Sequence, residues 1–254
     1  MPRFFVRTEQ IQDGAVTLLG DDAHHISRSL RMAAGEHITV CDTQGIEYDC
    51  CLTDFLPDCV KASICSSKTS ESEPRYTATL FQALPKGDKL DSIIQKAVEC
   101  GVSEIYTFES ERCIVRIKEG SEEKKTERRA RIALEAAKQC GRGRIPTVHP
   151  TQSFSRMLKD AAKAQIPLFC YEGEGTQDLR SVLQSARFDQ QGATPTVSIV
   201  VGSEGGFSPD EARLAKEAGL VPVGLGNRIL RTETAAAFVL ACLVYEFDMG
   251  GKTE

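Results

Sequence analysis

The sequence predicts an α/β protein made of a small β domain over residues 1–72 and a larger α/β domain over residues 73–254. The first part contains short apolar runs separated by turn residues, which is typical of strands. After Pro74 similar runs alternate with helical patterns. Between the two parts, residues 66–74 (SSKTSESEP) are polar and show no periodic pattern of apolar residues, so we expect a linker there.

Strands are expected in the first domain wherever Val, Ile, Thr and Cys cluster, which occurs at residues 15–19, 37–41, 48–52 and 61–65. Turn pairs such as Asp13-Gly14 and Gln44-Gly45 separate these runs. Residues 21–32 differ, because aspartates suited to capping precede the apolar pair Ile26 and Leu30 at helical spacing. One short helix is therefore expected among the strands.

In the second domain, short continuous apolar runs predict strands buried on both faces of a parallel sheet, at residues 76–84, 103–108, 168–171, 197–201 and 221–225. Helices are expected to begin at Asp88, Ser121 and Ser208, and Ser208-Pro209-Asp210-Glu211 is a complete helix start. The last helix, residues 232–248, is apolar nearly all round. It must be buried, and a second subunit is one surface that could cover it.

Composition narrows the class of protein. Apolar residues make up 41% and charged residues 26%, as in globular proteins. No apolar run approaches the roughly 20 residues that a membrane span needs, and the N-terminus lacks the pattern of a signal peptide, so we expect a cytoplasmic protein. The ten cysteines form no C-x-x-C pair, and the four histidines do not lie near them at zinc-finger spacing. We therefore expect no metal site.

The charge distribution excludes a general polyanion binder, because the formal net charge is −5. Residues 112–144, however, hold eleven basic residues against five acidic ones. Basic side chains at spacings of four, three, seven and four share one helical face and are followed by Arg144; they are Lys124, Arg128, Arg131, Lys138 and Arg142. A solvated face and a phosphate-binding face both fit this pattern.

Glycine-rich loops follow three of the predicted strands, at residues 172–175, 202–206 and 224–228. Each alone could be an ordinary tight turn. Together, at the carboxyl ends of a parallel sheet, they suit a flat heterocycle and ribose bound by main-chain groups. A P-loop and a dinucleotide fingerprint are absent from the sequence. A hydrolase nucleophile elbow is disfavoured because Val201 replaces its first glycine and the last histidine, His149, comes too early.

Several motifs together resemble the RsmE family of 16S rRNA uridine N3-methyltransferases, within the SPOUT class. The two densest are LGNRILRTET at 225–234 and VGSEGGFS at 201–208. The others are KGDK from Lys86, SERC from Ser110, QCGRGRIP from Gln139, and the His25 to Met32 pattern. Ser203 departs from the family, which usually has proline there, and so raises the question of loop rigidity.

The resemblance implies a PUA-like β-barrel for RNA binding, then a SPOUT domain with a trefoil knot. It implies S-adenosylmethionine (SAM) as cofactor, 16S rRNA or the small ribosomal subunit as partner, and a homodimer. The implied cofactor-binding residues are Cys170, Glu172, Gly173, Gly202, Glu204, Gly205, Gly206, Leu225, Gly226, Ile229, Leu230 and Thr234. Candidate RNA-binding residues are Arg3, Arg7, Arg28, Arg31, Arg112, Lys124, Arg128, Arg131, Lys138, Arg142 and Arg144.

Methylation of uridine N3 requires loss of its proton, so the site must supply a base or positive charge for the resulting anion. We expect Arg228 or Arg231 to stabilise the anion or a phosphate. Glu233 would position that arginine or accept the proton, and an Arg231–Glu233 ion pair that only supports the loop is the alternative. A SPOUT enzyme acting on ribose 2′-oxygen and an RNA-binding protein without catalysis are the other hypotheses.

Overall fold

The computed structural model describes residues 1–116, 120, 122–186 and 194–249, which form two compact units. Unit 1 contains Met1–Glu73 and Glu135–Ile145, and unit 2 contains Pro74–Leu134 and Pro146–Glu254. Sequence reasoning did not place residues 135–145 with the first domain. Residues 135–140 continue the helix of the residues before them, so nothing local marks a boundary at Glu135.

Unit 1 is built on one six-stranded sheet with the strand order β1-β4-β5-β6-β3-β2. Only β1 and β4 pair in parallel, and the other neighbours are antiparallel. The strands are β1 (Arg3–Phe5), β2 (Ile11–Gln12), β3 (Ala15–Leu19), β4 (His37–Cys41), β5 (Ile46–Phe55) and β6 (Cys59–Thr69). All four predicted strands are present. The predicted linker was partly wrong, because β6 continues to Thr69 where its polar residues pair with the start of β5.

The short helix of unit 1 is α1 (Gly20–His24) followed by a π-helical turn, η2 (His25–Ser29). Ile26 is fully buried in the core, whereas Leu30 is 40% exposed. We expected both side chains on the buried face, because residues four apart share one face of an α-helix. This turn is a π-helix, in which residues four apart no longer lie on the same face.

Unit 2 contains an entirely parallel sheet, which confirms the predicted class. Its order is β10-β8-β7-β13-β11-β14-β12, with β9 on β8. The strands are β7 (Thr77–Ala83), β8 (Glu104–Glu109), β9 (Thr147–Val148), β10 (Gln152–Ser153), β11 (Ile166–Cys170), β12 (Gln177–Asp178), β13 (Thr196–Val201) and β14 (Val221–Gly224). Strands β7 and β13 are central and almost wholly buried, which explains their continuous apolar character.

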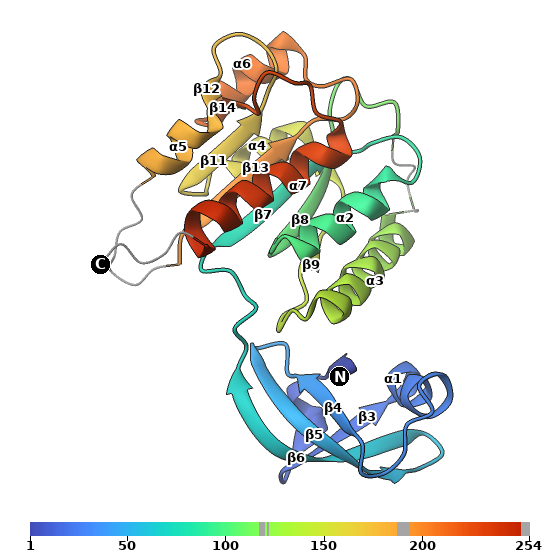
Figure 1. Ribbon diagram of the computed structural model, residues 1–254. Helices are drawn as coiled ribbons and strands as arrows, with labels where there is room; N and C mark the ends of the chain where they lie inside the picture. The colour runs from blue at the N-terminus through green and yellow to red at the C-terminus, as the bar shows by residue number, and fades with distance from the viewer. Residues whose placement is uncertain (117–119, 121, 187–193, 250–254) are drawn as a thin grey trace, which may run out of the picture. The chain divides into compact units, whose positions relative to one another are not determined.

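Helices α2 (Lys89–Glu99) and α7 (Thr232–Leu243) lie side by side on one face of this sheet, and α4 (Phe154–Ala161) covers the other (Figure 1). The remaining helices are α3 (Glu122–Cys140), α5 (Leu179–Ser185), α6 (Pro209–Glu217) and the π-helical turn η3 (Val244–Asp248). The Ser208 capping box at α6 is confirmed. Asp88 precedes α2 as expected, but its side chain makes no capping bond.

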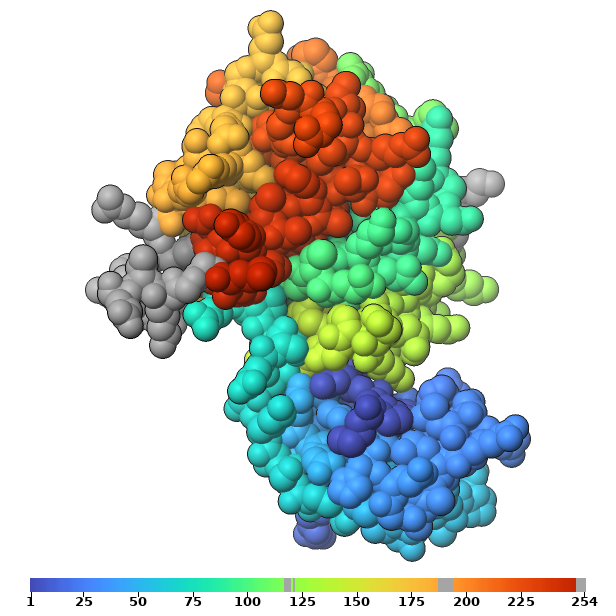
Figure 2. All heavy atoms as spheres, viewed as in Figure 1, coloured from blue at the N-terminus to red at the C-terminus, as the bar shows by residue number. Residues whose placement is uncertain are grey.

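Within one chain the last helix is buried on one side only. Its inner face, which includes Val239, Leu240 and Leu243, is buried, whereas Phe238 is 39% exposed and Tyr245 of η3 is 71% exposed. Figure 2 shows α7 and η3 as a continuous part of the visible surface of unit 2. No helix in the described part of the chain is both long and apolar enough to cross a membrane.

Candidate active site

A cavity of about 810 Å³ lies in unit 2 at the carboxyl ends of β11, β13 and β14. The three glycine-rich loops converge on it, as the sequence predicts. They do so because β13, β11 and β14 are consecutive neighbours in the sheet, so their carboxyl ends share one edge. Residues following β7 and β8, Lys89 and Arg112, also line the cavity.

The cavity wall contains every residue expected to bind the cofactor except Thr234. Thr234 is exposed on the first turn of α7, and Thr232 lines the cavity in its place. Residues two apart on a helix point about 200° away from each other, so only one of these threonines can face the site. The motif identified the helix start but not which threonine faces inward.

The loop after β13 is a tight turn in which Gly202 has little room for a side chain. A Cβ atom on Gly202 would approach the Gly206 Cα and the Phe207 ring to 3.2 Å. Gly206, at a φ of +64°, donates its N–H to the Ser203 carbonyl at 2.9 Å. The turn is therefore held by its own hydrogen bond with serine in place of proline, and the Ser203 hydroxyl is buried without a hydrogen-bond partner.

A buried polar network fixes this loop to the rest of unit 2. The Thr232 hydroxyl donates to the Gly202 carbonyl at 2.6 Å, and Gln82 Nε2 donates to the Thr232 hydroxyl at 2.9 Å. Gln82 is fully buried in β7. Sequence reasoning missed both side chains, although a glutamine inside an otherwise apolar strand was a signal.

The three proposed catalytic residues, Arg228, Arg231 and Glu233, all line the cavity. Arg231 is 84% exposed and lies 4.0 Å from Glu233 Oε1, at the limit of an ion pair. Glu233 Oε2 is buried without a hydrogen-bond partner, and the Lys89 ammonium lies 4.0 Å from it. This carboxylate oxygen therefore lies at the limit of ion-pair distance from an ammonium group but accepts no hydrogen bond.

Lys89 is a further residue that sequence reasoning missed, although it ends the KGDK motif. Its ammonium donates to Glu204 Oε1 at 2.7 Å, and the Lys86 backbone N–H donates to the same carboxylate at 3.1 Å. Burial alone would raise the pKa of Glu204, but the hydrogen bond from Lys89 and the backbone N–H groups outweigh it and lower that pKa. Lys89 therefore lies between an ionised Glu204 and Glu233.

Arg112, a candidate for phosphate contact, lies at the cavity and donates to the Gly205 carbonyl at 3.0 Å. Its loop is fixed by Glu211, which accepts from the Glu111 backbone N–H at 2.8 Å. Glu211 also completes the capping box of α6. The start of α6 therefore positions the arginine beside the glycine loop.

Most other candidate RNA-binding side chains are exposed, namely Arg7, Arg28, Arg31, Lys124, Arg128, Arg131 and Arg144. Arg128 nevertheless forms a bidentate pair with Asp91, with both distances 2.7 Å. Lys138 is half-buried and pairs with Asp22 at 3.0 Å. The basic face of α3 thus carries charges that are partly neutralised by the protein itself.

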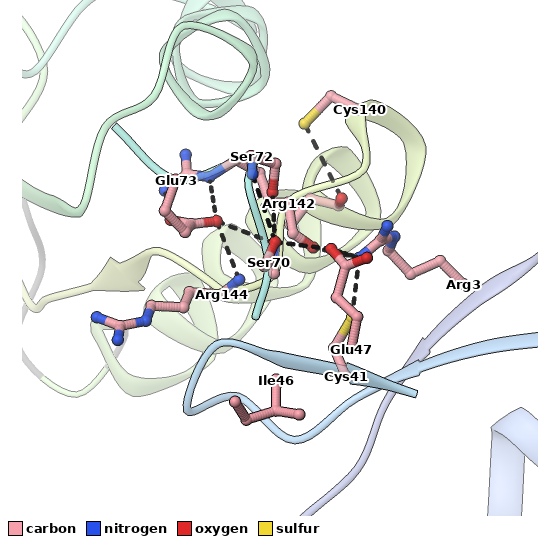
Figure 3. Close-up of polar contacts among 12 residues, drawn as sticks. Arg3, Cys41, Ile46, Glu47, Ser70, Ser72, Glu73, Cys140, Arg142 and Arg144 are labelled. Atoms are coloured by element: carbon pink, nitrogen blue, oxygen red, sulfur yellow. Dashed lines mark hydrogen bonds and ion pairs between the residues drawn. The ribbon is translucent and has the colours of Figure 1, made fainter. Parts of the chain in front are cut away.

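Two of the expected RNA-binding arginines are structural instead (Figure 3). The side chain of Arg142 is 5% exposed, and its guanidinium donates to both carboxylate oxygens of Glu73, at 3.0 and 2.7 Å. Arg3 is 16% exposed and donates to Glu47 Oε1 at 2.9 Å. The expectation was wrong for these residues, because buried guanidinium groups with carboxylate partners do not face a phosphate in solution.

Comparison with known proteins agrees with this geometry. Residues 71–244 match the family model described as the RNA methyltransferase domain. Residues 18–54 match the model described as the RNA methyltransferase PUA domain. The fold and the cavity therefore define the class as an RNA methyltransferase with a PUA-like first unit.

The chain is 32% identical to ribosomal RNA small subunit methyltransferase E of Bacillus subtilis, with 98% of both chains covered. A crystal structure of the enzyme of the same name from Neisseria gonorrhoeae, bound to S-adenosyl methionine, is similar with a TM-score of 0.82 and 30% identity, covering 96% of this chain and 97% of that one. A protein from Legionella pneumophila, solved in complex with SAM, also has a TM-score of 0.82, with 29% identity and 96% of each chain covered. The chain belongs to the ribosomal RNA small subunit methyltransferase E family.

Proposed function

We propose that this protein transfers a methyl group from SAM to N3 of a uridine in 16S rRNA of the small ribosomal subunit. It does so as a cytoplasmic homodimer. The observation that carries the proposal is the cavity formed by the glycine-rich loops of unit 2, together with the family to which the chain belongs. The proposed SPOUT arrangement, with its knot and a barrel in unit 1, rests on the family resemblance.

The residues of the cavity fit SAM as a ligand. A volume of about 810 Å³ lies in the range of small-molecule sites, and exposed backbone groups of the loops can bind an adenine and ribose. The Ser203 hydroxyl, which is buried without a hydrogen-bond partner, offers a further hydrogen-bonding atom. When bound, SAM supplies a methyl group on a sulfonium, which needs little further activation.

Glu233 is the proton acceptor in this proposal. Its Oε2 atom is buried in the site without a hydrogen bond, and the Lys89 ammonium lies 4.0 Å away, so it can take the N3 proton without first breaking a hydrogen bond. Arg231, exposed at the cavity, supplies positive charge for the uracil anion. Arg228 is assigned to an adjacent phosphate.

Lys89 is a positioning residue in this scheme. Because Glu204 accepts its hydrogen bond at 2.7 Å, the ammonium stays 4.0 Å from Glu233 and does not block Oε2. We expect Lys89→Met to lower turnover by about 10²-fold, the loss that a misplacement of a reacting group by about 1 Å can cause.

Kinetics on the full chain would test this role. The control is Lys86→Met, because the exposed Lys86 side chain can be removed while its backbone N–H still binds Glu204. Equal rates for the two variants would contradict the role of Lys89. The SAM affinity of both variants, measured by calorimetry, separates loss of catalysis from loss of the site.

RNA is proposed to contact the exposed cations of α3 and of unit 1. Among the described residues, Lys124 and Arg131 are exposed and have no ion-pair partner. If each contacts a phosphate, each change to Gln should reduce the slope of log affinity against log salt by about one. Lys216→Gln on α6 is the matched control, and the same slope in all three variants would exclude this surface.

Mass spectrometry of nucleosides from 16S rRNA tests the reaction itself. Cells lacking the protein should lose one N3-methyluridine, and a Glu233→Gln variant should not restore it. Loss of a ribose 2′-O-methyl nucleoside would assign the alternative chemistry. An unchanged nucleoside profile, with no SAM binding in calorimetry, would leave an RNA-binding protein without catalysis.

A further inference from the structure

The solvent face of the sheet in unit 1 brings together three side chains from three neighbouring strands: His37 of β4, Asp49 of β5 and Cys65 of β6. Their ligand atoms all lie within 4.8 Å of one another. His37 Nδ1 and Asp49 Oδ1 are 2.9 Å apart. This group, called here the His37 cluster, is separate from the cavity of unit 2.

Strand register explains why these side chains meet. Thr39 pairs with Asp49, so Asp49 is the diagonal neighbour of His37 across the β4–β5 ladder. Between β5 and β6, Asp49 pairs with Ser66 and Cys50 pairs with Ile64, which leaves Cys65 as the extra residue of a bulge. A bulge re-aims side chains, and here it sets the thiol on the face of Asp49 while Cys50 remains in the core.

An imidazole nitrogen, a carboxylate oxygen and a thiolate sulfur form a donor set that suits Zn²⁺, whereas Ca²⁺ and Mg²⁺ prefer oxygen ligands alone. Tetrahedral zinc with bonds of about 2.0–2.3 Å separates its ligand atoms by roughly 3.3–3.8 Å. His37 Nδ1 and Asp49 Oδ1 are closer than this, at 2.9 Å, and every pair of ligand atoms in the cluster lies within 4.8 Å. His37 and Cys65 are exposed, so small side-chain rotations can adjust them.

We propose that the His37 cluster binds one Zn²⁺ through His37 Nδ1, an Asp49 carboxylate oxygen and the Cys65 thiolate, with water in the fourth position. Binding releases the thiol proton of Cys65 to solvent. The ion joins β4, β5 and β6 on the face opposite the core of unit 1. Because metal bound only by the folded sheet adds to folding free energy, the site stabilises this unit.

Zinc affinity of the full-length, reduced protein, measured by competition with a chromogenic chelator, tests the proposal. We expect one equivalent to bind. Removing a single outer-shell partner of a metal weakens binding about 10–100-fold, so His37→Asn, Asp49→Asn and Cys65→Ser should each weaken it at least tenfold. Cys59→Ser is the matched control, because Cys59 is a half-buried thiol of the same strand outside the cluster.

Cobalt(II) provides a second measurement that does not depend on activity. The Co²⁺-loaded protein should show a thiolate-to-cobalt charge-transfer band that Cys65→Ser removes and Cys59→Ser keeps. Zinc should also raise the thermal unfolding temperature of the parent more than that of Cys65→Ser. Absence of binding in the parent, or equal affinity in the Cys59 and Cys65 variants, would overturn the proposal, and neither result bears on methyl transfer.

Discussion

At the scale of residues, Arg142 illustrates how burial decides what a charged side chain does. In the sequence it belongs to a regular basic stripe, yet its guanidinium is buried against Glu73. Glu73 also accepts from the backbone N–H of Gly143 at 2.9 Å and of Arg144 at 3.2 Å. One carboxylate therefore holds both a buried cation and the chain that follows α3.

Replacing Glu73 should destabilise unit 1, because it removes a carboxylate that is paired with a buried guanidinium. We expect Glu73→Gln to cost about 2 kcal/mol in urea unfolding at pH 7, less than a fully buried pair because Glu73 keeps 20% of its exposure. The control is Glu71→Gln on the exposed chain nearby, which should change stability by less than about 0.5 kcal/mol.

The stabilisation by Glu73 should depend on pH. Burial opposes ionisation, but the hydrogen bonds from Arg142 and the backbone outweigh it and lower the pKa of Glu73 from its ordinary 4.5. A lowered folded-state pKa adds stability that is complete above 4.5 and disappears as the pH falls through the folded value. The difference between the parent and Glu73→Gln should therefore shrink in acid. A constant difference would contradict the assignment.

At the scale of elements, the start of α6 links local sequence to the active site. The Ser208 hydroxyl accepts from the Glu211 N–H at 3.2 Å, and Glu211 accepts from the Ser208 N–H at 3.0 Å. This reciprocal pair of hydrogen bonds can be predicted from the sequence, because both residues lie within four consecutive positions. Glu211 also accepts a hydrogen bond from the loop that carries Arg112. This contact cannot be predicted from local sequence, because that loop lies about a hundred residues earlier in the chain.

Breaking this helix start should therefore affect both stability and cofactor binding. We expect Ser208→Ala to cost about 1 kcal/mol, typical of a lost N-cap, and to weaken SAM binding severalfold. Ser153→Ala removes the cap of α4, which accepts from the Arg156 N–H at 3.3 Å, and should cost a similar stability without changing SAM affinity. Calorimetry with both variants compares them, and equal losses of affinity would count against a link between α6 and the site.

At the scale of the whole molecule, the exposed apolar side of α7 and η3 supports the proposed homodimer. Phe238, Tyr245 and Met249 are 39%, 71% and 72% exposed. A helix that is apolar on all sides is normally covered, and within one chain only its inner face is. A second copy would cover the remainder.

We expect Phe238→Glu to convert the protein into monomers, because a carboxylate in an apolar interface is left without solvent or a partner. Light scattering and sedimentation velocity report the mass directly. The control is Leu214→Glu on α6, since Leu214 is 40% exposed on another helix. A parent that sediments as a monomer, or a dimer that survives the Phe238 change, would refute this interface.

Local sequence patterns were enough to predict the parallel sheet, most strand positions, the start of α6 at Ser208 and the three loops that form the cavity. Each of these depends on residues close together in the chain, through alternation, capping or glycine-rich turns. Other features are evident only from the tertiary structure. Arg142 is buried, and Lys89 lies between two carboxylates. Thr232 and not Thr234 lines the cavity, and His37 lies close to Cys65. Burial, ion pairing and cross-strand contact depend on which distant segments become neighbours, and strand order and register set that choice.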